Sequence, residues 1–103
     1  MANAKEALLD VLRETRVLLE RPDNDFCWST WDGATKALAE LDVFIAAIEA
    51  GREFNSLTLQ VLFAPTGDLQ EVSVSSGWGH EFCQVAERFD HALEAYQKFI
   101  KRG

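Results

Sequence analysis

The chain has 103 residues, the usual size of one domain, and 48% of them are hydrophobic, which is enough for one buried core and too many for a disordered chain. Its 10 Lys and Arg residues are outnumbered by 17 Asp and Glu residues, so the net charge is −7. This balance argues against binding to nucleic acid or to an anionic membrane surface, and it is compatible with a basic partner. We expect a single domain over residues 1–103.

The location of the protein is predicted from its apolar segments and its cysteines. No segment is apolar enough to span a bilayer, and the first residues lack the long apolar run of a secretory signal. The two cysteines, Cys27 and Cys83, are too few for a disulfide framework. We therefore expect a cytoplasmic protein with free thiols, in which both cysteines are small, partly buried packing residues.

The first element in the chain is a predicted helix over residues 4–20. Apolar side chains recur there at helical spacing and form one stripe, with charged residues outside it. Pro22 disfavours a helical conformation at Arg21, so the helix should stop there. Residues 21–29 are then expected to form a loop.

A second helix is predicted to run to about Ala50. Ser29 and Asp32 have the spacing of a capping box at its start, and Gly51 suits the position that follows a helix end. Small apolar residues recur along its back face: Ala39, Val43, Ala46 and Ala50. A surface helix normally carries charges there, so we expect a second contact on this side, either within the fold or across a dimer interface.

Residues 57–63 and 69–75 are predicted to form an antiparallel β-hairpin. Apolar residues alternate in the first segment, and Pro65–Asp68 is a turn signal. Pairing Ala64 with Leu69 sorts both segments into one apolar and one polar face, as a half-solvated sheet requires. The exposed edges of such a hairpin would allow strand pairing with a second copy, which would extend the sheet.

A long final helix is predicted from about His80 to Lys101 by a nearly continuous apolar stripe. The order of elements is therefore α-α-β-β-α. The predicted fold class is α+β, with three helices packed against one antiparallel β-hairpin.

Candidate catalytic and metal-binding groups are few. His80 and His91 share the helix face opposite the apolar stripe, which is typical of surface histidines. His80 and Cys83 are three residues apart, but the chain lacks the paired CxxC or HxxxH ligands of a zinc site. The segment Gly77–Gly79 lacks the Lys-Ser or Lys-Thr of a phosphate loop, so we interpret it as a tight connection. No metal, cofactor or nucleophilic site is expected.

Aromatic residues outside the helical stripes are the most informative feature. Phe26, Trp28 and Trp31 precede the second helix, while Trp78 and His80 lie at the start of the last one. Both segments could meet at one end of the domain. Aromatic surface patches are typical of binding sites, but the same rings could instead close the open end of a small core.

The leading interpretation is a protein-interaction or regulatory module that binds another protein or its own copy, as a possible homodimer. The alternative is a small-molecule or anion-binding protein, or a modest enzyme, with a site at the Trp28/Trp31/Trp78 end. In that case His80 would act as acid–base and the Gly77–Gly79 backbone would hold an anion. An enclosed pocket would favour the alternative, and an exposed apolar patch would favour the interaction module.

Overall fold

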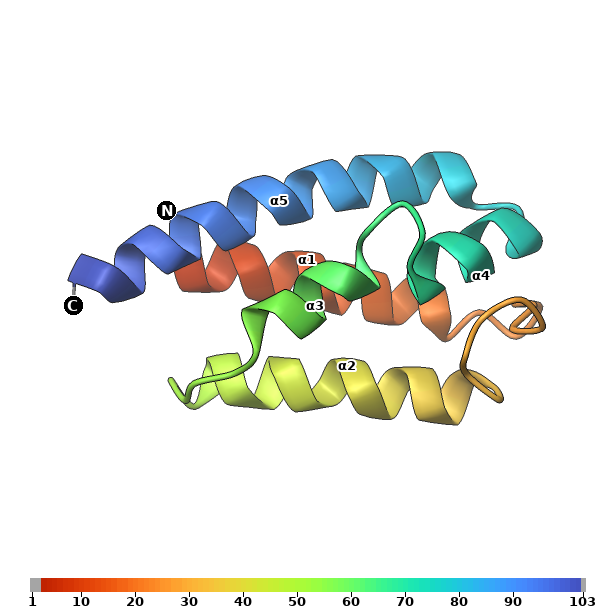
Figure 1. Ribbon diagram of the computed structural model, residues 1–103, viewed down its shortest axis with the longest axis horizontal. Coiled ribbons are helices and arrows are strands. Elements are labelled where there is room, and N and C mark those ends of the chain that lie inside the picture. The colour runs from red at the N-terminus through yellow and green to blue at the C-terminus, as the bar shows by residue number, and fades with distance from the viewer. Residues whose placement is uncertain (1–2, 103) are drawn as a thin grey trace.

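The computed structural model describes residues 3–102 as helices joined by loops. Five α-helices follow one another along the chain (Figure 1): α1 Ala4–Leu19, α2 Ala34–Glu49, α3 Ser56–Leu62, α4 Asp68–Ser76 and α5 Gly79–Arg102. No strand occurs within this range, so the predicted α+β class with its β-hairpin is wrong and the fold is all-helical. Because the hairpin is absent from the described residues, dimerisation by strand pairing has no structural basis there. None of the described helices is both long and apolar enough to cross a membrane.

The first predicted strand, residues 57–63, lies mostly in α3. This segment buries side chains at helical spacing: Leu59, Leu62 and Phe63. Strand alternation also placed Leu57 and Val61 on the apolar face, whereas both are exposed. The helix begins at a side-chain cap, because the Asn55 side chain accepts a hydrogen bond from the Thr58 N–H at 3.0 Å.

The second predicted strand, residues 69–75, lies within α4. Its buried residues again have helical spacing: Leu69, Val72 and Ser73. Val74, which the hairpin register placed beside Val72, is 61% exposed. Asp68 and Glu71 occupy the first turn, where acidic side chains suit the helix dipole. Gly77 ends the helix in the left-handed region, at φ 87°.

The three long helices agree better with the sequence. The helix predicted over residues 4–20 is α1, and the long final helix is α5. Gly51 follows α2 with φ 69°, which confirms its predicted role at the helix end. The predicted capping box at Ser29 is wrong, because the Ser29 hydroxyl donates to the Phe26 carbonyl in a turn at 2.9 Å and α2 begins only after Gly33.

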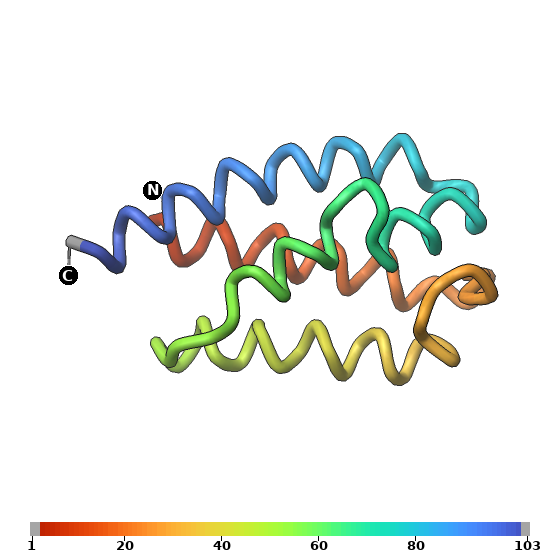
Figure 2. The backbone as a smooth tube through the Cα atoms, in the orientation of Figure 1, coloured from red at the N-terminus to blue at the C-terminus, as the bar shows by residue number. Residues whose placement is uncertain are grey.

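The helix α1 packs against both α2 and α5, and it runs antiparallel to each of them (Figures 1 and 2). Ion pairs join these helices at their surfaces. The Arg16 guanidinium donates to both carboxylate oxygens of Asp42 on α2, at 2.8 and 3.2 Å. Arg88 on α5 donates in the same way to Glu14, at 3.0 and 2.7 Å, and this hydrogen bonding lowers the pKa of Glu14.

The back face of α2 is exposed. All four of its small apolar residues face solvent: Ala39, Val43, Ala46 and Ala50. The expected second contact is therefore not made by another helix of the same chain. The only large side chain of the four, Val43, borders a shallow apolar groove between α2 and α3 that is also lined by Phe44 and Leu62.

The shorter helices close the rest of the core. The helix α4 packs against α5 (Figure 1), and the loop before it places Phe63 against Phe89, with ring centroids 3.9 Å apart and planes 7° apart. The helix α1 begins and α5 ends at the same end of the molecule (Figure 2). The loop of residues 20–33, together with α4 and the start of α5, lies at the opposite end.

Candidate functional site

The loop of residues 20–33 is held to the helices around it by side-chain hydrogen bonds. Asn24 is its central anchor, because its amide nitrogen donates to the carbonyls of Leu18 and Leu19 at 2.9 and 3.1 Å. The same side chain accepts the Trp78 indole N–H at 2.8 Å through its amide oxygen. Asn24 thus satisfies carbonyls at the end of α1 and joins them to the start of α5.

Further contacts hold the rest of the loop. The Asp25 N–H donates to the Ser76 hydroxyl on α4 at 2.8 Å. The backbone N–H and the hydroxyl of Thr30 both donate to the Asp68 carboxylate at the start of α4. The loop is therefore fixed on both sides of Trp28, at positions 24–25 and at position 30.

The three tryptophans divide into two buried rings and one exposed ring. Trp31 and Trp78 are 4% and 2% exposed, and the Trp31 indole N–H donates to the Glu40 carboxylate at 2.6 Å. Trp78 contacts Phe82 edge to face, with ring centroids 6.4 Å apart. These two rings close the end of the core. Trp28 is 73% exposed.

The five residues named from the sequence do not form a single aromatic surface. Phe26 is half-buried against the core, and His80 is exposed on α5, as is His91. Gly77 and Trp78 use their backbone N–H groups to bond the carbonyls of Val74 and Ser73 at the end of α4. Those two amides are thus engaged in the helix cap and not directed at an anion.

Cys27 and Cys83 are both exposed, so the expectation that they are packing residues is wrong. Hydrogen bonding to Asp25, followed by the charge of its carboxylate, raises the pKa of the Cys27 thiol. A raised pKa keeps the thiol protonated, which does not suit a nucleophile. Among residues 3–102, no cluster of three His, Cys, Asp or Glu side chains could hold a metal ion.

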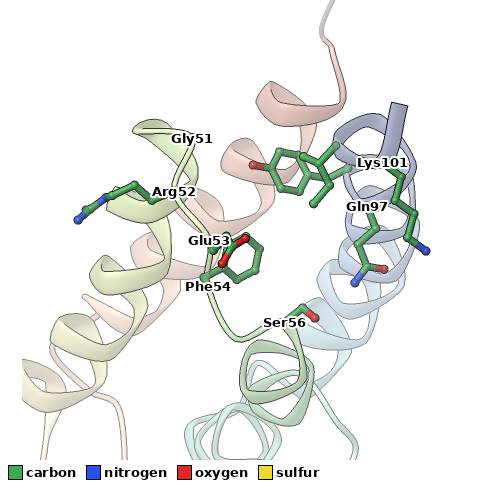
Figure 3. Close-up of a pocket in the computed structure, with 9 residues that line it drawn as sticks. Gly51, Arg52, Glu53, Phe54, Ser56, Gln97 and Lys101 are labelled. Atoms are coloured by element: carbon green, nitrogen blue, oxygen red, sulfur yellow. The ribbon is translucent and has the colours of Figure 1, made fainter. Parts of the chain in front are cut away.

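Cavities lie at both ends of the molecule. At the loop end, a hollow of about 550 Å³ is lined by the loop itself, and its lining includes Phe26 and Trp31 but not Trp28, Trp78 or His80. At the opposite end, a cavity of about 450 Å³ separates the segment after α2 from the last turns of α5. Figure 3 shows Arg52 and Lys101 on opposite sides of this cavity, pointing away from each other. Its charged side chains do not converge on a common point, as they do in a small-molecule site.

Comparison of the chain with protein-family models, curated proteins and solved structures gives no significant match. Its function can thus be inferred only from its own residues.

Two important residues were not singled out from the sequence. Asn24 and Asp68 position the loop, although neither is part of a recognised motif. Asn and Asp often bond nearby backbone groups in turns, and this is the signal that Asn24 carried, two residues after the helix-ending Pro22. No local signal indicated that Asp68 would bond to Thr30, because these residues are far apart in the sequence.

Proposed function

We propose that this protein is an interaction module that binds another protein through the loop of residues 20–33, with Trp28 as the anchor. The exposure of Trp28 carries this proposal. A large aromatic side chain that is 73% exposed loses favourable burial unless a partner covers it. Tryptophan is also among the residues most enriched at the energetic centres of protein interfaces.

The fixed backbone on either side of Trp28 supports the same proposal. A flexible loop must be ordered when it binds, and this ordering weakens affinity. Here hydrogen bonds from Asn24, Asp25 and Thr30 order the loop in advance. The loop is also longer than most connections between adjacent helices, and long ordered loops are commonly functional.

Replacing Trp28 by Ala is expected to abolish partner capture while changing the free energy of unfolding by less than about 0.5 kcal/mol, because the ring is not part of the core. Affinity capture from the source cells would compare the wild type, Trp28→Ala and a control, Val17→Ala. Val17 is a similarly exposed apolar residue on α1. The proposal requires a protein that the wild type and Val17→Ala retain and that Trp28→Ala loses. Identical captured proteins for all three would contradict it.

Self-association is a second candidate, favoured by the exposed back face of α2. The neighbouring helix α3 has no charged residue and exposes Leu57 and Val61, so two copies could approach there without direct repulsion. Sedimentation velocity is expected to show a dimer that Val43→Asp dissociates, since Val43 lies in the middle of this face. A wild type that remains monomeric at millimolar concentration would exclude this candidate.

A further inference from the structure

The charge of the molecule is concentrated at the end that carries Trp28. Residues 20–40 and 68–81, which form the loop, the first half of α2, α4 and the start of α5, contain eight Asp and Glu against two Lys and Arg. Their net charge is −6 out of the total of −7, and the rest of the chain is nearly neutral. These segments lie at one end of the molecule (Figure 1), so that end carries both the exposed Trp28 and almost all of the net charge.

Only some of the carboxylates at this end form ion pairs with Arg side chains of the same chain. Arg21 pairs with Glu81 at 3.0 Å, and Arg16 pairs with Glu20 at 2.9 Å. Asp23, Asp32 and Glu71 are exposed, and they have no ion-pair partner among the residues that the structure describes. Two of these three, Asp23 and Asp32, lie in the same loop as Trp28, on either side of it.

We infer that Trp28 and the carboxylates of its loop bind a cationic segment of a partner protein, rich in Arg or Lys. This inference rests on the proposed function and specifies the chemistry of the partner. The face of an indole ring attracts a guanidinium or ammonium group, and Arg is the more frequent partner in such contacts. An Arg side chain stacked on Trp28 would place neighbouring cations of the same segment near Asp23 and Asp32.

The charge of this end also disfavours a nucleic acid, an anionic membrane or a neutral protein as the partner. A nucleic acid or an anionic membrane would be repelled by a surface of net charge −6. A neutral apolar partner would cover Trp28 but would leave the exposed carboxylates of the same loop without counter-charges. A cationic segment satisfies both features, and the long-range attraction would accelerate its association.

The test uses the full chain and a short arginine-rich peptide, with the same peptide carrying neutral citrulline in place of arginine as its control. Binding is followed by NMR through the indole N–H resonance of Trp28, which Trp28→Phe identifies among the three tryptophans. The arginine peptide is expected to shift this resonance and the citrulline peptide to leave it in place. Raising the salt concentration from about 0.05 to about 0.5 M should weaken the binding severalfold.

Two double variants locate the charge effect. Asp23→Asn/Asp32→Asn is expected to weaken binding of the arginine peptide by about fivefold or more, since it removes two carboxylates from the loop that carries Trp28. Glu53→Gln/Asp90→Asn changes the net charge equally, at exposed positions away from the loop, and is expected to have little effect. Equal losses in the two variants would overturn the inference, because the effect would then be one of total charge.

The remaining outcomes separate the inference from the proposed function. Equal binding of both peptides at Trp28 would overturn the cationic partner and leave the interaction module intact. Arginine-specific shifts of the backbone amide resonances that persist in Trp28→Ala would instead remove Trp28 as the anchor and overturn the inference. If neither peptide shifts the Trp28 resonance at millimolar concentration, the inference is wrong.

Discussion

Replacing Trp78 by Ala is expected to lower the free energy of unfolding by about 3–5 kcal/mol, the range for truncating a large buried aromatic side chain. The ring is 2% exposed and contacts Phe82, so its removal leaves a cavity at the end of the core. It also removes the indole N–H that bonds the Asn24 oxygen at 2.8 Å. Chemical denaturation followed by circular dichroism would measure the change.

The control for this effect is Trp28→Ala, because the same change of side chain is made at the exposed position. We expect the denaturation midpoint of Trp28→Ala to stay close to that of the wild type. The midpoint of Trp78→Ala should be much lower, while the dependence of its unfolding free energy on denaturant concentration stays similar. Similar losses in the two variants would mean that Trp28 supports the core, and would contradict the role proposed for it. A further variant, Trp78→Phe, keeps most of the apolar ring and is expected to have an intermediate effect.

Gly67→Ala is expected to produce the second large loss of stability. The residue is buried between α3 and α4, where an added Cβ would overlap the Val61 carbonyl oxygen and lie 3.0 Å from that of Leu62. These are backbone atoms and cannot rotate away as a side chain could, so the loop itself must move. Overpacking of this kind typically costs about 1–3 kcal/mol, which corresponds to a fall in melting temperature of roughly 4–20 °C for a domain of this size.

Gly33→Ala is the matched control, because no heavy atom lies within 4 Å of a Cβ at position 33 and its φ of 170° is extended. Any residue can adopt that conformation, and the substitution reduces the freedom of the unfolded chain. Gly33 is also the N-cap of α2, where Ala is less favourable than Gly, so the melting temperature of Gly33→Ala should stay close to that of the wild type. A tolerated Gly67→Ala would show that the connection between α3 and α4 is looser than described.

The sequence predicted the long helices well and the short ones wrongly. In α1 and α5 the apolar stripe continues over several turns, so helical periodicity is unambiguous. The helices α3 and α4 have 7 and 9 residues, which is also the length of a strand. Over so few residues, one apolar run can hold both patterns: Leu57, Leu59, Val61 and Phe63 alternate, while Leu59, Leu62 and Phe63 have helical spacing and are the ones that are buried.

The signals that would have corrected this error lie at the ends of the segments. Asn55 is a favourable N-cap residue, and Gly77 a favourable residue after a helix end. The β-branched residues of both segments favoured strands, but tertiary packing overrides this preference when a helix buries the right side chains. Leu69 and Val72 lie one turn apart on α4 and both enter the core.

The sequence predicted that the tryptophans outside the helical stripes could meet at one end of the domain. The loop of residues 20–33 and the start of α5 do lie at one end of the molecule. Which ring would be exposed could not be predicted, because it depends on contacts between distant residues. Asn24 bonds to Trp78, and Thr30 bonds to Asp68, only in the folded chain. With the loop held in this way, Trp28 is the tryptophan that stays outside the core.

The placement of the chain ends has a practical consequence for measuring such interactions. The start of α1 and the end of α5 lie together at the end of the molecule opposite the loop of residues 20–33, to which Trp28 belongs (Figure 2). An affinity tag or a tether to a biosensor surface, joined at either terminus, would attach the molecule at the end away from its acidic loop and would leave that loop accessible from the solution.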